Sequence, residues 1–149
     1  MSMENPSRFP NPLIYAEYGK TANDEDQKIL LKDFIWVDPI LGDVKVPKGF
    51  IFDGASIPTF AWTSLGLHPF SSEVVKAGLV HDYLYSTKIL QRKDADEVLK
   101  RILKYENDLS AVTISIIYGA VRIAGGNAYD NIQDESEYLR PDEVEQFIK

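Results

Sequence analysis

The hydrophobic pattern of the chain changes its period near residue 71, and this change constrains the fold more than any other feature. Before it lie four short segments rich in β-branched and aromatic residues and separated by turn-forming residues, at 13–18, 28–37, 43–46 and 50–52. Such segments are typical of strands. After residue 71, apolar residues recur every three or four positions, as in helices. The sequence therefore predicts an α+β fold, with a small, mainly antiparallel N-terminal sheet followed by a three-helix C-terminal half.

Start and stop signals delimit the three helices. The serines at 71–72 are candidate N-caps for the first helix. The second is predicted to begin at Asp94, which precedes Glu97 by three positions in a carboxylate variant of the capping box. Ser110 is the expected cap of the third helix, which runs to the glycines at 125–126.

The length of 149 residues suits one domain. Residues 1–12 are polar and proline-rich, and we expect them to form a flexible N-terminal arm. Residues 13–128 are predicted to form a single α+β domain. Residues 129–149 read as an acidic tail with one more short helix, which has Pro141 at a favourable first position.

Composition narrows the classes of function. The chain has no cysteine, which removes disulfides, thiolate nucleophiles and cysteine-based zinc sites. A net charge of −7 argues against nucleic acid as the main partner. The most apolar stretch, at 111–126, is too short to span a membrane and contains Arg122, so an integral membrane protein is not expected. The N-terminus lacks the pattern of a secretory signal, which predicts a product that is soluble where it is made.

Two polar segments are candidates for chemistry. The first is the corner Asp53-Gly54-Ala55 with the residues up to Pro58, where glycine allows a left-handed backbone and proline stiffens the exit. Turn formation alone explains this composition. The functional alternative is that the carbonyl groups or the Asp53 carboxylate face a cation or a substrate. His68, which precedes a proline in a later loop, is expected at the surface or lining a site.

The second segment contains His81 and Asp82 inside an apolar helix. Neighbouring helical residues point about 100° apart, so each needs its own polar partner. Tyr85 lies on the same face as His81. Asp96 lies near the start of the next helix, which a short connection makes antiparallel, so its carboxylate can face His81. Taken singly, His81 reads as a core residue and Asp96 as a complement to the helix dipole.

Taken together, these residues have complementary roles in hydrolysis. His81, oriented by Asp96, would be a general base that draws a proton from water. Asp82 would bind calcium together with carbonyl groups of the 53–55 loop, and the ion would polarise an ester carbonyl. Four apolar residues are candidates for the rim of a lipid-facing cleft: Trp62, Phe60, Leu65 and Leu67. The alternative is a buried polar network that specifies packing without catalysis.

Two resemblances bear on these readings. The first rests on a set of motifs spread over residues 46–125: Val46-Pro-Lys-Gly-Phe, Asp53-Gly-Ala-Ser-Ile-Pro, Trp62, His81-Asp-Tyr-Leu-Tyr and Ala95-Asp96. This set resembles a family found in bacteriophages and prophages, domain of unknown function family 1353. The resemblance implies a phage or prophage origin and no particular activity.

The second resemblance is local. His81-Asp82-x-x-Tyr85 followed by Ala95-Asp96 is similar to the two-helix core of phospholipase A-two enzymes, particularly the cysteine-free type in parvovirus capsid proteins. It implies that His81 is the general base, that Asp96 is its partner, that Tyr85 supports Asp96 and that Asp82 binds calcium. The loop before His81, with Gly54 alone, has fewer glycines than the calcium loop of those enzymes.

The first hypothesis from the sequence is therefore a phage-encoded, calcium-dependent, phospholipase-like ester hydrolase that acts by water attack on lipid. The alternative is a non-catalytic structural or assembly protein of the phage head or tail, which would bind other phage proteins. A third reading, an acidic inhibitor of a host defence protein, fits the charge alone. In each case the protein is expected in the host cytoplasm when made, and in the second it would then enter the virion.

Overall fold

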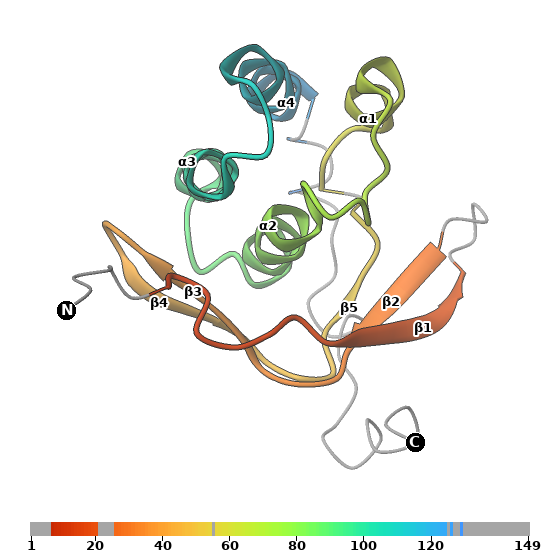
Figure 1. The fold of residues 1–149 in the computed structure, drawn as a ribbon, viewed down its shortest axis with the longest axis vertical. Coiled ribbons are helices and arrows are strands. Elements are labelled where there is room, and N and C mark those ends of the chain that lie inside the picture. The colour runs from red at the N-terminus through yellow and green to blue at the C-terminus, as the bar shows by residue number, and fades with distance from the viewer. Residues whose placement is uncertain (1–6, 21–25, 55, 125, 127–128, 130–149) are drawn as a thin grey trace, which may run out of the picture.

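Two small antiparallel sheets form one side of the molecule (Figure 1). The computed structural model describes residues 7–20, 26–54, 56–124, 126 and 129. One sheet has the strand order β1-β2-β5, and the other is the hairpin β3-β4. The strands are β1 (Tyr15–Lys20), β2 (Asp26–Leu30), β3 (Phe34–Asp38), β4 (Gly42–Val46) and β5 (Ile51–Phe52).

The segment predicted as one strand at 28–37 is two strands, because the chain leaves the first sheet after Leu30 and enters the second at Phe34. Asp33 lies in the crossing, and its carboxylate accepts the backbone N–H of Lys48 at 2.9 Å. A side chain that bonds to backbone in this way competes with the regular strand ladder. The apolar run at 28–37 therefore contains a break between two strands, and the hydrophobic pattern does not show this break.

The β3-β4 hairpin is fixed by one buried carboxylate. Asp38 accepts the backbone N–H groups of Ile40 and Leu41 in the turn, each at 3.0 Å. It also accepts the indole N–H of Trp36 at 2.9 Å and pairs with Arg101 at 3.0 Å. Since Arg101 belongs to a helix, the same carboxylate closes the turn and ties the hairpin to the helical half.

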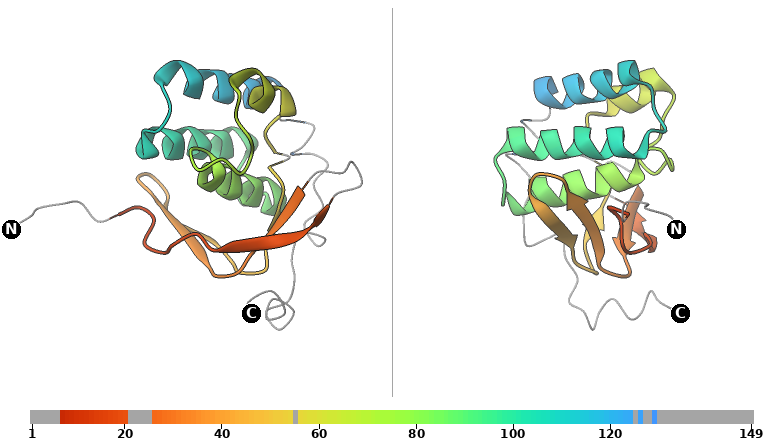
Figure 2. Two further views of the ribbon diagram at one scale, coloured as in Figure 1. Left: turned by 45° about the vertical axis from the view of Figure 1, so that its right-hand side comes forward. Right: turned by 60° about the vertical axis from the view of Figure 1, so that its left-hand side comes forward.

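The helices stack on the sheets in successive layers (Figure 2). They are α1 (Thr59–Leu65), α2 (Val75–Thr87), α3 (Arg92–Glu106) and α4 (Ala111–Ala124). Helix α2 lies on the sheets, α3 packs on α2, and α4 forms the outer layer with α1 beside it. Ten of the thirteen residues of α2 are buried, as expected for a helix covered on most sides.

The α+β class is confirmed, but the three-helix half is wrong, because the described residues contain four helices. Sequence reading missed α1, a helix of seven residues that starts directly after Pro58 and ends at Gly66, whose backbone is left-handed with φ 69°. Proline before the helix and glycine after it are ordinary helix boundaries. Two turns are too short for the hydrophobic period to show.

The helix starts also differ from those predicted. Helix α2 begins at Val75, after the serines at 71–72. Helix α3 begins at Arg92 with Gln91 as its N-cap, so Asp94 lies within the first turn and is not the cap. The prediction for α4 is confirmed, since it starts after Ser110, whose hydroxyl accepts the backbone N–H of Thr113 at 3.1 Å.

Part of the segment expected as an N-terminal arm packs on the hairpin. The ring of Phe9 lies 5.3 Å from that of Phe34 and 5.0 Å from that of Trp36, between ring centroids. At the other end, the Tyr129 hydroxyl donates to the Leu90 carbonyl at 3.1 Å. The expected helix near Pro141 lies outside the described residues.

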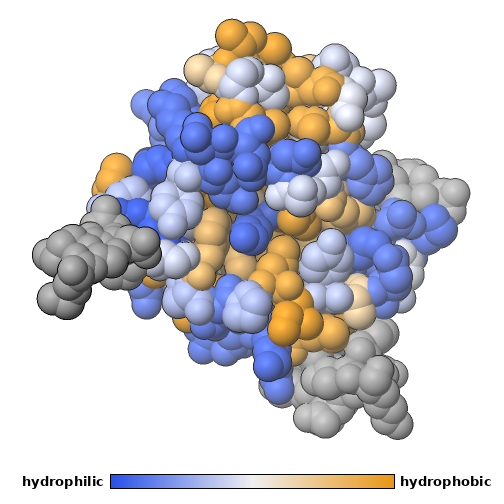
Figure 3. Space-filling model, viewed as in Figure 1, coloured by the Kyte–Doolittle hydropathy of each residue, from blue (hydrophilic) through white to orange (hydrophobic). Residues whose placement is uncertain are grey.

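The surface is divided between hydrophilic and hydrophobic areas (Figure 3). Apolar side chains gather over α4, where Val112, Ile116 and Ile123 are exposed. None of the helices in the described ranges is long and apolar enough to cross a membrane.

Candidate functional site

The loop from Asp53 to Pro58 is the centre of the candidate site, because it separates a buried polar cluster from an open cavity. Gly54 has a left-handed backbone with φ 78°. A Cβ atom at this position would lie 2.7 Å from Cβ of Pro69, closer than real atoms approach. Only glycine satisfies both conditions. The turn is closed by the Ile57 N–H, which donates to the Gly54 carbonyl at 3.1 Å.

Asp82 of α2 holds the inner side of this loop. Its Oδ2 accepts the backbone N–H of Gly54 at 2.8 Å, and its Oδ1 accepts the backbone N–H of Ser56 at 3.3 Å. The Ser56 hydroxyl bonds to the same Oδ1. Burial and the nearby negative charge of Asp53 raise the pKa of Asp82 to about 7, although the hydrogen bonds from the loop act in the opposite direction.

His81 lies one residue earlier and has no exposed surface. Its Nε2 is 2.7 Å from Oδ1 of Asp96, and its Nδ1 is 2.8 Å from Oγ of Ser56. Burial lowers the pKa of His81, while Asp96 acts against that effect. In the neutral ring that burial favours, Nε2–H donates to Asp96 and Nδ1 accepts the hydroxyl of Ser56.

The hydroxyl of Ser56 carries a single hydrogen but bonds to both Asp82 and His81. Both bonds form only if one of these two neighbours supplies a further hydrogen. The directions of the two pKa shifts place that proton on Asp82, whose pKa is raised, and away from His81, whose pKa is lowered. Asp82, Ser56 and His81 therefore share their protons as one buried unit.

Asp96 joins three helices. Its Oδ1 accepts the Tyr85 hydroxyl at 2.6 Å in addition to His81, and its Oδ2 accepts Nη1 of Arg122 from α4 at 2.6 Å. Arg92 lies 3.6 Å from the same Oδ2. Burial alone would raise the pKa of Asp96, but the hydrogen bonds from His81 and Tyr85 prevail and lower it. This carboxylate stays charged and ties α2, α3 and α4 together.

The structure brings together three of the residues singled out in the sequence, His81, Tyr85 and Asp96, in the contacts expected of them. Ser56 and Arg122 were not expected in this cluster. A serine in a turn has no periodic signal, so Ser56 could not be selected. The sequence did contain a signal for Arg122, because a single charge inside an apolar helix needs a buried partner or a route to water.

The calcium site expected at Asp82 and the 53–55 loop stays a prediction. Both oxygens of Asp82 accept hydrogens from the loop, whereas a calcium site needs carbonyl oxygens beside the carboxylate. Ala55 lies outside the described residues. Among the residues that the structure does describe, no group of three or more metal-ligating side chains comes together.

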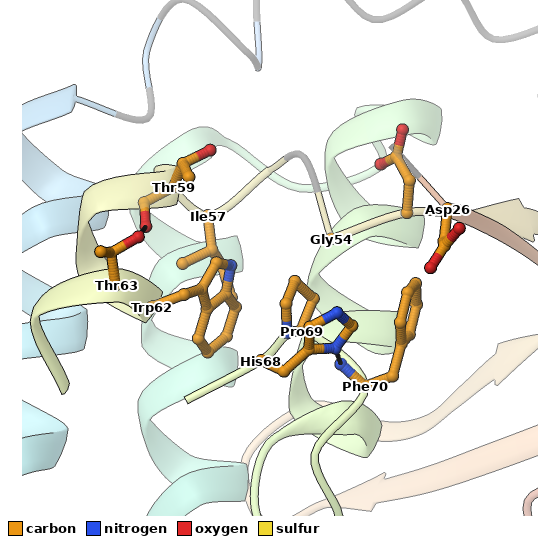
Figure 4. A pocket seen from close by; sticks show the side chains of 10 residues that line it. Asp26, Gly54, Ile57, Thr59, Trp62, Thr63, His68, Pro69 and Phe70 are labelled. Atoms are coloured by element: carbon orange, nitrogen blue, oxygen red, sulfur yellow. Dashed lines mark hydrogen bonds between the residues drawn. The ribbon is translucent and has the colours of Figure 1, made fainter. Parts of the chain in front are cut away.

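An open cavity of about 310 Å³ lies on the outer side of the loop (Figure 4). Its walls include Asp26, Asp53, Ile57, Trp62, His68 and Phe70. Trp62 is 5% exposed, and its indole N–H has no hydrogen-bond partner among the residues that the structure describes. Of the four residues expected at the rim of a cleft, only Trp62 is in this wall, since Phe60 is exposed on the surface while Leu65 and Leu67 pack against the core.

Comparison with known proteins identifies the family of the chain. Residues 29–121 match the model of a family described as a protein of unknown function, DUF1353, and this range contains the loop, the buried cluster apart from Arg122, and Trp62. The chain belongs to the DUF1353 family. This membership agrees with the family resemblance seen in the motifs of residues 46–125.

One relative of this DUF1353 protein is uncharacterized protein y4jT of Sinorhizobium fredii (strain NBRC 101917 / NGR234). The two are 42% identical over 59 residues, which cover 40% of this chain and 17% of the relative. The match thus spans less than a fifth of that protein's length. Neither description names an activity, a phage or a phospholipase. No solved structure matches the chain.

Proposed function

We propose that this DUF1353 protein is a non-catalytic binding protein, in which Ser56, His81, Asp82 and Asp96 form a structural network. The observation that carries this proposal is the state of His81, which has no exposed surface and a bonded partner on each ring nitrogen. A general base must present a nitrogen to the proton that it removes. Here Nδ1 accepts the hydroxyl of Ser56, and Ser56 is itself fully buried, so neither group faces a substrate or bulk water.

The network has a clear mechanical effect. Asp82 and Ser56 hold the loop from the inside, and Asp96 holds Tyr85, His81 and Arg122 across three helices. Buried polar groups that are satisfied in this way specify one packing arrangement. The loop is thereby held in place, and its outer side shapes the cavity beside Trp62. A place in a phage virion or in its assembly would suit such a binding protein and stays a prediction from the sequence.

A second function, ester hydrolysis, is favoured by one specific observation. Ser56, His81 and Asp96 form a line of hydroxyl, imidazole and carboxylate, with heavy-atom distances of 2.8 Å and 2.7 Å. A base that touches a hydroxyl and is oriented by a third group is the usual arrangement for activating a nucleophile. Catalysis by water attack would require water to take the place of Ser56 at Nδ1.

Acyl release from mixed phospholipid vesicles separates the two functions. The full chain is measured with calcium and with a chelator, beside Asp96→Asn and the control Asp94→Asn, an exposed carboxylate in the same helix turn. We expect no release above the protein-free control from any of the three. Release by the wild type and by Asp94→Asn, lost in Asp96→Asn, would overturn the structural role and establish the hydrolase. The wild-type measurement decides the matter even if Asp96→Asn does not fold.

A further inference from the structure

The cavity outside the loop presents hydrogen-bond donors from two aromatic side chains. Within the described part of the chain, the buried indole N–H of Trp62 has no partner, which is costly for a polar group shielded from bulk water. Nδ1 of His68 accepts the backbone N–H of Phe70 at 3.2 Å, so in the neutral ring Nε2 carries the hydrogen. Both rings project into the cavity (Figure 4).

The same cavity presents acceptors. The carboxylates of Asp26 and Asp53 lie in its wall. Asp26 pairs with Lys20 at 2.9 Å, and this pairing lowers the pKa of Asp26, so its charge is already balanced. A carboxylate in an ion pair still accepts further hydrogen bonds, because its two oxygens offer about four acceptor positions.

Apolar surfaces complete the walls. Ile57 is buried beside the indole of Trp62, and Phe70 stands on the opposite side of the cavity near Asp26 (Figure 4). The Phe70 ring is held in place by the edge of Phe52, with 6.1 Å between centroids, and by Lys28, whose ammonium lies 4.7 Å from the Phe70 centroid. The cavity therefore offers fixed ring surfaces as well as donors and acceptors.

This combination disfavours three classes of ligand. An ammonium or guanidinium group has only donors and would leave the N–H groups of Trp62 and His68 without acceptors. An anion would face the carboxylates of Asp26 and Asp53. An apolar ligand would leave donors and acceptors unpaired. A neutral ring bearing several hydroxyl groups meets all of these demands, since each hydroxyl both donates and accepts and the C–H faces of the ring pack on aromatic side chains.

We propose, building on the binding role proposed above, that this cavity binds a neutral sugar residue of a glycan. One hydroxyl would accept from Trp62 and a second from His68, while neighbouring hydroxyls donate to Asp26 and Asp53. The volume of about 310 Å³ lies at the small end of the range for small-molecule sites, about 300 to 1,000 Å³, as a site for a single sugar ring requires.

The two tryptophans of the chain give this proposal an internal control. Trp36 is fully buried, and its indole N–H is bonded to Asp38 at 2.9 Å. Proton–nitrogen spectra of the labelled full chain therefore show one indole signal that should respond to a sugar and one that should not. The probes are N-acetylglucosamine and the methyl glycosides of glucose, galactose and mannose, each added to about 50 mM to cover millimolar dissociation constants.

We expect at least one probe to move the Trp62 indole signal in a saturable way while the Trp36 signal stays in place. Trp62→Phe identifies the signal by removing it. His68→Ala, which changes an exposed side chain, should weaken binding about 3- to 10-fold through the loss of one hydrogen bond.

A Trp62 signal that none of the four sugars moves would overturn the proposal. So would a response to arginine amide without a response to any sugar, because that result assigns the cavity to a cation. Equal movement of both indole signals would also overturn it, since it indicates non-specific binding. These outcomes are independent of acyl release, which overturns the proposed structural role of the network whatever the sugars do.

Discussion

The polar groups on the inner and outer sides of the 53–58 loop differ in whether they have hydrogen-bond partners. On the inner side, the polar groups of Asp82, Ser56 and His81 are hydrogen-bonded to one another or to the loop, and the histidine has no exposed surface. On the outer side, the buried indole N–H of Trp62 has no partner in the described ranges of the chain. A satisfied buried network stabilises a packing arrangement, whereas an unsatisfied donor in a cavity wall indicates a missing partner. The contrast supports the proposal that the inner side of the loop stabilises the fold and that the outer side binds a ligand.

The largest effect is expected from breaking the inner side at Asp96. Asp96→Asn keeps the shape of the side chain but removes the charge that pairs with Arg122 and receives Tyr85 and His81. Breaking a buried ion pair costs about 3–5 kcal/mol in the free energy of unfolding, and we expect the low end because Arg122 is 30% exposed and can reach water. Urea unfolding followed by circular dichroism measures the loss.

Asp94→Asn is the matched control for this prediction. Asp94 lies in the first turn of the same helix but is exposed, so its substitution should change stability by less than about 0.5 kcal/mol. Equal losses in the two variants would mean that the network contributes nothing beyond ordinary helix electrostatics, and the inner side of the loop would no longer differ from the surface.

The second effect concerns the loop itself and compares two glycines with left-handed backbones. Gly66→Ala meets open space and should cost about 1–2 kcal/mol of stability for its backbone conformation alone. Gly54→Ala has the same backbone cost and also places Cβ against Pro69, which adds about 1–3 kcal/mol. Thermal unfolding of both variants gives the difference. Identical melting temperatures would show that Pro69 moves aside and that the loop is less rigid than its contacts imply.

The regular helices and strands are the part of the molecule that the sequence alone predicts best. The change of period near residue 71 was enough to predict an α+β chain, and the spacing of His81, Tyr85 and Asp96 was enough to predict their contacts, because helix geometry fixes which side chains share a face. In a regular helix or strand, the spacing of residues along the sequence determines which side chains lie on the same face. That is why the buried cluster was within reach of sequence reasoning.

The features that the sequence did not predict lie in segments without a regular hydrophobic period. Helix α1 has seven residues, Ser56 lies in a turn, and the cavity joins Asp26 to Phe70 across 44 positions that no spacing rule relates. Arg122 is different, because its charge inside an apolar helix was visible, but its partner in another helix was not. Irregular segments and long-range pairings depend on tertiary packing, which a single sequence does not display.

The third effect is a change in the pH dependence of stability. Burial and Asp53 raise the pKa of Asp82 to about 7, whereas in the unfolded chain it lies near 3.9. The folded state therefore holds a proton that the unfolded state loses, so the stability contributed by this group is present below about pH 4 and is lost as pH rises to about 7. His81 acts in the opposite direction, since its pKa is lowered and its contribution is lost as pH falls.

The Asp82→Asn variant lacks the pH dependence of stability that Asp82 contributes. Its stability should therefore show the pH dependence that His81 contributes. We expect the variant to gain stability from about pH 5 to pH 6.5 relative to its own value at pH 5, with a slope of at most about 1.4 kcal/mol per pH unit. The wild type should be flatter in this interval because the two groups offset each other. Urea midpoints at four pH values measure both curves, and parallel curves would contradict the raised pKa of Asp82.

The smallest effect belongs to the outer side and sharpens the comparison most directly, because it contrasts the two tryptophans. Trp62→Phe deletes a donor that has no partner among the described residues. The cost of lost packing is therefore offset by the removal of an unpaired polar group, and stability should change by less than about 1 kcal/mol. Trp36→Phe deletes a donor that serves the buried Asp38, and its cost should be about 1–3 kcal/mol larger. Urea unfolding of the two variants under identical conditions gives the difference. If Trp62→Phe costs as much as Trp36→Phe, the indole of Trp62 has a structural partner in solution, and the outer side of the loop loses the unpaired donor that marks it as a binding surface.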